Sequence, residues 1–225
     1  MAWLPGSAPN ASEGKMIRTQ TGNAMFMNGA FYVLNAPANS VTNTTTTTSL
    51  FVGDPFSASP AATPIVVQLG IPPFAQYPGS TRILPPGALA PGTMFNMDFY
   101  GTVADASTAT LQLQLGLIGP GTSTTFTVLA DTTAVAMSTE STSFLHMQAG
   151  FCVQTYASAA NGGGTINAWI GYENATTGIT VYSPIKANTA FDTTQQYTID
   201  IRATWGAASS TNLIQLWYGD MEVIG

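Results

Sequence analysis

Apolar and polar residues alternate with a period of two along most of the chain beyond residue 80. Such alternation predicts β-strands that bury one face and present the other to solvent or to a partner. In the clearest segment, Ile199, Ile201 and Trp205 belong to the apolar set, and Asp200 and Arg202 belong to the polar set. The segments that carry the pattern are residues 95–100, 111–117, 145–154, 165–170, 197–205 and 214–218.

Turn-forming residues separate these segments. Glycine, proline, asparagine and serine gather at residues 119–121, 161–164, 174–178 and 206–210. No stretch has apolar residues at the 3.6-residue spacing of an amphipathic helix, so we expect little helix and no parallel sheet, which would need crossover helices. The pattern predicts an all-β jelly roll or β-sandwich of about eight antiparallel strands.

Residues 1–80 differ from the rest of the chain. They hold most of its 14 prolines, and short apolar stretches interrupt segments rich in proline, serine and alanine. Proline removes a donor from the hydrogen-bond ladder, which makes a central sheet improbable here. We therefore expect an extended N-terminal arm with short strands over 1–80 and a jelly-roll domain over 81–225. The alternative is that residues 1–80 are edge strands and loops of one domain.

The composition favours a shell or appendage protein over an enzyme. Only 7% of the 225 residues are charged, against about 25% in an average soluble domain. The hydroxyl and amide side chains of threonine, serine and asparagine contact water in place of charged groups, and threonine also favours β-strands. The formal net charge of −6, without any basic stripe, predicts no nucleic-acid partner.

The chain also lacks the sequence signals of export and membrane insertion. No run of about 20 apolar residues occurs, and residues 1–6 have neither a basic nor an apolar signal region. We therefore expect no membrane partner, no signal peptide and synthesis in a cytoplasm. The single cysteine, Cys152, excludes a disulfide within the chain.

Candidate catalytic and metal-binding residues are few. A serine–histidine–aspartate triad would need His146, the one histidine, and Cys152 lies roughly 20 Å away along the same predicted strand. One histidine, one cysteine and scattered carboxylates do not make a zinc site within one chain. We predict no enzyme activity, no metal and no cofactor.

Paired carboxylates are the remaining route to catalysis, because glycosidases use them. The candidates are Asp98, Asp200, Asp220 and Glu222. Asp200 shares a predicted strand face with Arg202, so we expect an ion pair on the exposed side of the sheet. Trp169 and Trp217 alternate with apolar neighbours and point away from the core, whereas Trp205 joins the core.

Two segments carry a resemblance to a known family. The turn Pro85-x-Gly87-x-Leu89-x-x-Gly92 precedes the first long strand, and Trp205-Gly-Ala-Ala-Ser-x-x-Asn212 joins the last two. Over residues 81–225 the chain resembles a jelly-roll module of minor structural proteins in tailed bacteriophages, which include head decoration (cement) proteins and fibres. The resemblance implies a trimeric protein on the virion surface.

From this resemblance we expect a decoration protein that binds the major capsid protein on the outside of the head and stabilises the lattice. The alternative is a fibre or tail module that binds host glycan through Trp169 and Trp217. Candidate contacts with the capsid or between subunits are Phe26, Phe31, Tyr32, Phe51, Trp169 and Trp217.

Overall fold

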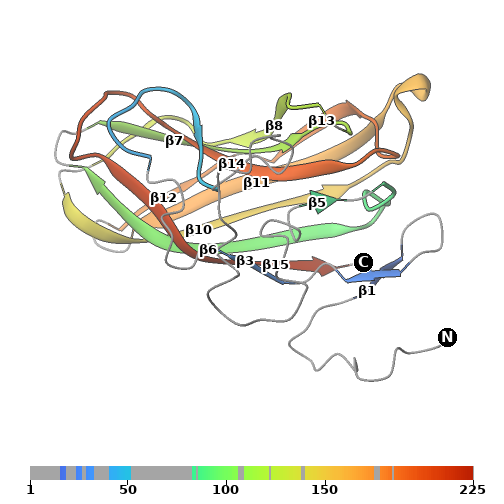
Figure 1. The fold of residues 1–225 in the computed structure, drawn as a ribbon, viewed down its shortest axis with the longest axis horizontal. Helices are drawn as coiled ribbons and strands as arrows, with labels where there is room; N and C mark the ends of the chain where they lie inside the picture. The colour runs from blue at the N-terminus through green and yellow to red at the C-terminus, as the bar shows by residue number, and fades with distance from the viewer. Residues whose placement is uncertain are drawn as a thin grey trace.

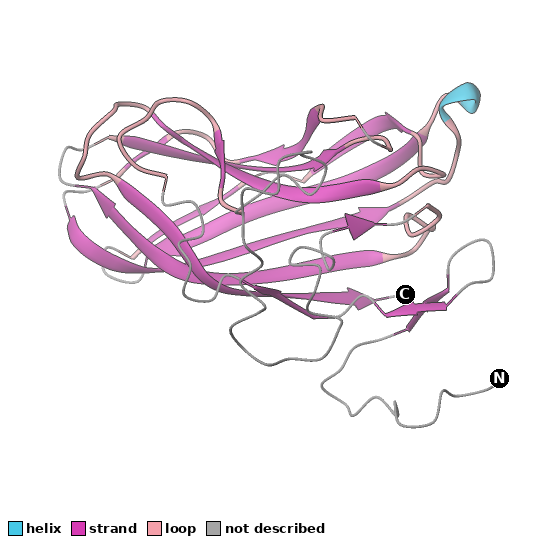
Figure 2. Cartoon of the chain, viewed as in Figure 1, coloured by secondary structure: helices cyan, strands magenta, loops and turns pink. Residues whose placement is uncertain are grey.

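The chain folds as two antiparallel β-sheets packed face to face (Figures 1 and 2). The structure is a computed structural model. It describes residues 16–18, 24–26, 29–32, 41–51, 83–84, 86–105, 109–121, 123–137, 140–174, 178–183 and 185–224. Within these residues the all-β prediction is confirmed, since the one helix is the short 3₁₀ turn at Ala159–Asn161.

The larger sheet has seven strands within the described residues, and its main path runs β12-β11-β10-β6-β15-β3, with β13 also paired to β11. Their bounds are β3 (Gly29–Tyr32), β6 (Met94–Asp105), β10 (Glu140–Val153), β11 (Gly164–Asn174), β12 (Ile179–Tyr182), β13 (Lys186–Phe191) and β15 (Leu213–Ile224).

The smaller sheet has six described strands. Its path runs β4-β14-β7-β8, with β5 paired to β14 and β9 paired to β7. The bounds are β4 (Thr48–Ser49), β5 (Ile83–Leu84), β7 (Thr110–Ile118), β8 (Phe126–Asp131), β9 (Val135–Ala136) and β14 (Tyr197–Trp205). A separate two-stranded sheet joins β1 (Met16–Arg18) to β2 (Ala24–Phe26). No helix among the described residues is long and apolar enough to cross a bilayer.

A two-stranded ribbon turns the corner between the sheets. In the larger sheet, β6 pairs with β15. In the smaller sheet, β7, which follows β6 in the chain, pairs with β14, which precedes β15. Leu213 is opposite Ala104 before the corner, and Trp205 is opposite Leu111 after it. This folded-over ribbon is the arrangement expected for a jelly roll.

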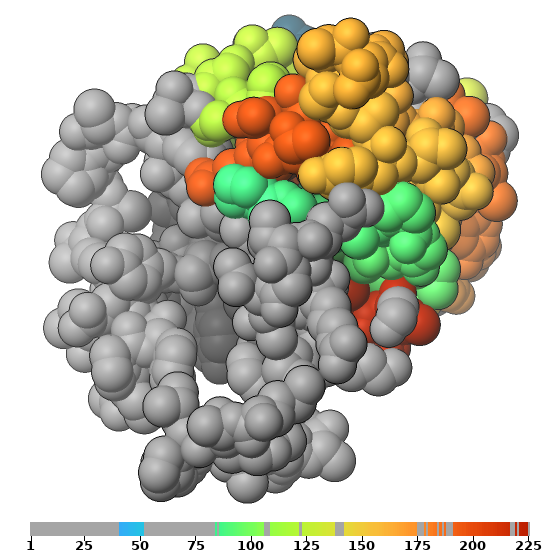
Figure 3. Space-filling view, turned by 90° about the vertical axis from the view of Figure 1, so that its right-hand side faces the viewer, coloured from blue at the N-terminus to red at the C-terminus, as the bar shows by residue number. Residues whose placement is uncertain are grey.

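The core lies between the sheets and follows the predicted alternation. The inward residues of β6, β7, β10, β11 and β14 are buried, and Trp205 is fully buried, as predicted. At one end of the sandwich, loops close the core: the Gly92 amide donates to the Val153 carbonyl (2.8 Å), and the Thr193 amide donates to the Ala157 carbonyl (3.1 Å). Figure 3 looks onto this end, where these segments lie side by side.

A β-bulge breaks the alternation in β15. Its register against β6 shifts between Leu216 and Tyr218, so Tyr218 pairs with Tyr100, an outer-face residue. The backbone register therefore places Tyr218 out of phase with Ile214 and Leu216. Beyond the bulge, burial resumes at Met221 and Val223, because one extra residue changes the phase of a strand.

The bulge requires a glycine on the neighbouring strand. A Cβ atom at Gly101 would lie 2.0 Å from the backbone carbonyl oxygen of Gln215. Backbone on a paired strand has little freedom to move away, so a side chain at this position forces the ribbon apart.

We predict that Gly101→Ala lowers the free energy of unfolding by about 2 kcal/mol or more, the range of overpacked cores. Gly162→Ala is the control, because Gly162 has a positive φ of 84° and no atom within 4 Å of its Cβ position. It should lose only about 1–2 kcal/mol from left-handed strain. Urea denaturation followed by circular dichroism measures both, and equal losses or a larger loss for Gly162→Ala would contradict the bulge account.

Candidate functional site

The predicted contact residues fall into separate groups. Phe31 and Tyr32 lie on β3 and Trp217 on β15, and these two strands are paired, so the backbone brings three predicted contacts to one edge of the larger sheet. Phe26 lies on β2 in the separate two-stranded sheet. The side chains of these four residues lie outside the described part of the structure.

Phe51 and Trp169 lie elsewhere. Phe51 is buried in the core of its own chain, with its ring centroid 5.8 Å from that of Phe99. This placement corrects the expectation that Phe51 contacts the capsid or a neighbouring subunit. Trp169 is half-buried on the outer face of β11, and the strands β10, β6 and β15 separate it from β3.

Residues 41–51 form a strap that joins the two sheets. At its start, Val41 makes two backbone hydrogen bonds with Ile214 of β15 (3.1 and 3.2 Å). At its end, Thr48 and Ser49 pair with β14, and the Leu50 amide donates to the carbonyl of Ile201 (2.8 Å). The strap thus follows the outside of the ribbon corner from the larger sheet to the smaller one (Figure 1).

The strap also contributes to the core. Val41 and Leu50 are buried. The Trp205 indole nitrogen donates to the Val41 carbonyl oxygen (3.0 Å), which satisfies the one polar atom of a fully buried ring. These contacts include residues 41–51 in the sandwich, so the sandwich extends N-terminal to the boundary that we expected at residue 81.

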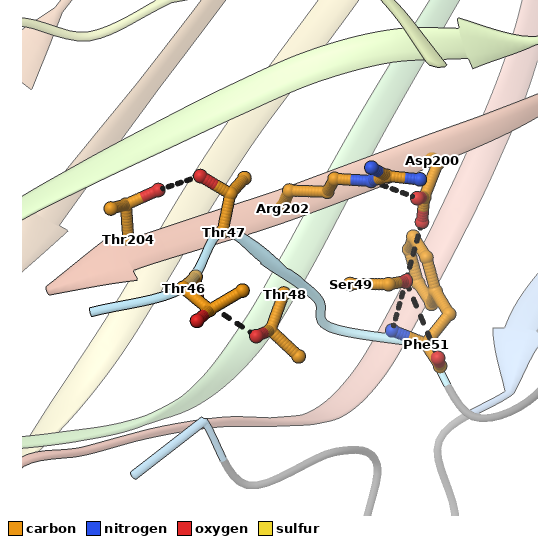
Figure 4. A network of polar contacts seen from close by, with 8 residues as sticks. All are labelled: Thr46, Thr47, Thr48, Ser49, Phe51, Asp200, Arg202 and Thr204. Carbon is orange, nitrogen blue, oxygen red and sulfur yellow. Dashed lines mark hydrogen bonds and ion pairs between the residues drawn. The ribbon is translucent and has the colours of Figure 1, made fainter. Parts of the chain in front are cut away.

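Polar side chains fasten the strap to β14 (Figure 4). The Ser49 hydroxyl donates to Oδ1 of Asp200 (2.6 Å), and Arg202 Nε donates to Oδ2 of the same carboxylate (2.8 Å). The hydroxyls of Thr47 and Thr204 lie 2.8 Å apart. Hydrogen bonds to a buried charged group are stronger than those between neutral groups, so Asp200 is the main polar anchor.

The predicted ion pair between Asp200 and Arg202 is present, but its environment differs from the prediction. Only 1% of the Asp200 side chain is exposed, against 26% for Arg202. The guanidinium carbon of Arg202 also lies 3.9 Å from the centroid of the Phe126 ring. Strand alternation alone places Asp200 on the outer face and gives no sign that the chain covers it.

The structure brings His146 and Asp98 together across the larger sheet. His146 Nε2 lies 3.1 Å from Oδ1 of Asp98, and Gln148 Nε2 donates to the same oxygen (2.9 Å). The imidazole stacks on Tyr100 with centroids 4.8 Å apart and an angle of 4°. Sequence analysis missed this cluster, because Asp98 and His146 lie 48 residues apart and only the β6–β10 register makes them neighbours.

The described residues show no metal centre: no group of three or more histidine, cysteine, aspartate or glutamate residues among them could hold an ion.

Burial raises the pKa of Tyr172 to about 12. Its hydroxyl donates to the Met137 sulfur (3.7 Å) in the core. A phenol with this pKa stays protonated at neutral pH, so Tyr172 stabilises the fold by packing and not by charge.

We predict that Ser49→Ala destabilises the protein more than Thr47→Ala. Removing the Ser49 hydroxyl takes a donor from the buried Asp200 carboxylate, at a cost of about 1.5–3 kcal/mol. The Thr47 hydroxyl is exposed, and its removal should cost less than about 0.5 kcal/mol. Urea denaturation measures both, and a negligible effect of Ser49→Ala would show that the strap is not fastened at Asp200.

We also predict that two truncations differ sharply. A chain that begins at Val41 keeps the strap and should unfold cooperatively. A chain that begins at Phe51 loses Val41 and Leu50 from the core. Removal of a large buried side chain lowers the free energy of unfolding by about 2–5 kcal/mol, so this chain should be largely unfolded. Thermal unfolding followed by tryptophan fluorescence distinguishes them, and equal stability would exclude a structural role for the strap.

No protein-family model matches the chain, and no curated protein matches it.

Proposed function

We propose that this chain is a decoration protein of a tailed-phage head, which binds the outside of the capsid through its N-terminal region and stabilises the lattice. The observation that carries the proposal is the strap. An N-terminal segment that binds a capsid holds its domain in place only if it is firmly joined to that domain. Residues 41–51 provide this junction through both sheets and the core.

The position of β3 supports the same proposal. β3 extends the larger sheet by pairing with β15, and it carries Phe31 and Tyr32, while Trp217 lies in the bulge segment of β15. Aromatic residues at a sheet edge next to an N-terminal segment are suited to contact a protein surface, because interface centres are enriched in tyrosine, tryptophan and phenylalanine. Phe26 on β2 would extend the contact further along the N-terminal region.

A decoration protein stabilises a capsid by mass action. It must bind the assembled lattice more tightly than the free capsid subunits, and the lattice is then stabilised in proportion to this difference. Apolar burial contributes about 25 cal/mol per Å² before the costs of ordering the N-terminal region are subtracted. The proposal includes a homotrimer, which would multiply these contacts through effective concentration.

We predict that the chain beginning at Val41 no longer binds heads. Full-length protein added to heads that lack it should co-sediment with them and raise the temperature at which they release DNA. The shortened chain should do neither, although it stays folded. Trp169→Ala is the control: it lies on a strand remote from β3 and should bind heads like the unaltered protein.

Undiminished binding by the shortened chain would refute the N-terminal attachment. Failure of the full-length protein to bind any head would refute the decoration function itself. Sedimentation equilibrium tests the trimer, since three chains of 23.4 kDa are readily distinguished from one.

A further inference from the structure

The outer face of the larger sheet concentrates exposed aromatic side chains. Among the described residues, Phe144 on β10 and Tyr182 on β12 are exposed to 44% and 58%. Trp169 on β11 and Tyr100 on β6 are half-buried on the same face. Single exposed apolar residues are normal on a protein surface, whereas a contiguous group indicates a binding surface.

Two of these rings lie over glycines of the neighbouring strand. Trp169 pairs with Gly150, and a Cβ atom there would lie 3.0 Å from two carbons of the indole. Tyr182 pairs with Gly171, whose Cβ position lies 2.1 Å from the phenol ring. A ring that covers a glycine rests on the sheet backbone, so its other face is turned toward solvent.

Polar atoms without a protein partner lie beside these rings. Oδ1 of Asp98 accepts from His146 and Gln148, whereas Oδ2 has no hydrogen-bond partner in the described part of the chain. Three further polar atoms also have no hydrogen-bond partner among the described residues: His146 Nδ1, Gln148 Oε1 and the Trp169 indole nitrogen. The Asp98 side chain is 38% exposed, so Oδ2 can accept from a ligand.

The sheet register makes these groups one continuous surface. Gln148 is opposite Asp98, His146 is opposite Tyr100, and the ring of Trp169 covers Gly150, two residues beyond Gln148 on β10. From Phe144 to Gly150 the surface follows β10 for about 20 Å. A surface of this length matches a ligand built of several linked rings better than it matches one small molecule.

The charge of the surface narrows the class of ligand. Asp98, Glu173 and Glu222 lie on this face, and Asp220 is opposite Asp98 in the register. The one arginine or lysine whose side chain the structure describes, Arg202, belongs to the smaller sheet. The carboxylates on this face disfavour anionic ligands by simple Coulomb repulsion.

We infer that the outer face of β6, β10 and β11 binds a neutral oligosaccharide. The C–H bonds of a sugar ring carry slight positive charge and pack on the negative face of an aromatic ring. Sugar hydroxyls both donate and accept, so they match the mixed set of Asp98, His146, Gln148 and Trp169. The site does not depend on the proposed head attachment, since β3 lies beyond β15 at the other edge of the sheet.

The test is binding of purified full-length protein to neutral hexasaccharides of glucose, mannose, galactose and N-acetylglucosamine, and to hexasaccharides of uronic acids. Saturation-transfer NMR and tryptophan fluorescence report binding without any capsid. We expect saturable binding of at least one neutral hexasaccharide and none of the uronic acids. Trp169→Ala and Asp98→Asn should each weaken it at least tenfold, and Gln148→Ala gives a milder variant if either fails to fold.

Phe126→Ala is the matched control, because Phe126 covers Gly116 on the outer face of the smaller sheet and should leave sugar binding unchanged. Three results would overturn the inference. These are no binding of any neutral hexasaccharide, a preference for uronic acids, and equal binding by the variants and the unaltered protein. A change in sedimentation coefficient of Trp169→Ala without sugar binding would identify the face as a contact between subunits instead.

Discussion

The structure depends on the corner where the β6–β15 ribbon of the larger sheet becomes the β7–β14 ribbon of the smaller one. A sandwich whose strands change sheets must keep its hydrogen-bond ladder in register and its core filled at the turn. Here Trp205 fills the space, and its indole nitrogen is satisfied by the Val41 carbonyl of a segment more than 160 residues earlier in the chain. The strap therefore completes the corner from outside, and both sheets share one buried cluster.

This arrangement relates the unusual composition to the fold. With 7% charged residues, the chain relies on hydroxyl groups for contacts that other proteins make with ion pairs. At the end of the threonine run, Thr48 pairs with β14 and the Thr47 hydroxyl contacts Thr204, and the next residue, Ser49, binds the buried Asp200. A run that in isolation is typical of a solvated linker thus contributes to the sheet.

Much of the fold could be predicted from local pattern. The alternation in 111–117 and 197–205 gives the strands and their buried faces, because each side chain's face is determined by its position in the strand. The pattern fails where contacts between residues far apart in the sequence determine whether a side chain is buried or where a strand bulges. The bulge at Trp217 depends on Gly101, the burial of Phe51 depends on Phe99, and the neighbours of His146 depend on the β6–β10 register.

The larger sheet thus has two proposed tasks, capsid attachment at the edge formed by β3 and saccharide binding on the outer face of β6, β10 and β11. Cryo-electron microscopy of heads decorated with the full-length protein tests the central claim most directly. We predict that the sandwich lies on the outer capsid surface, with residues 1–40 in contact with the major capsid protein and the Trp169 face turned outward. A sandwich attached through the Trp169 face, or heads without any added density, would contradict it.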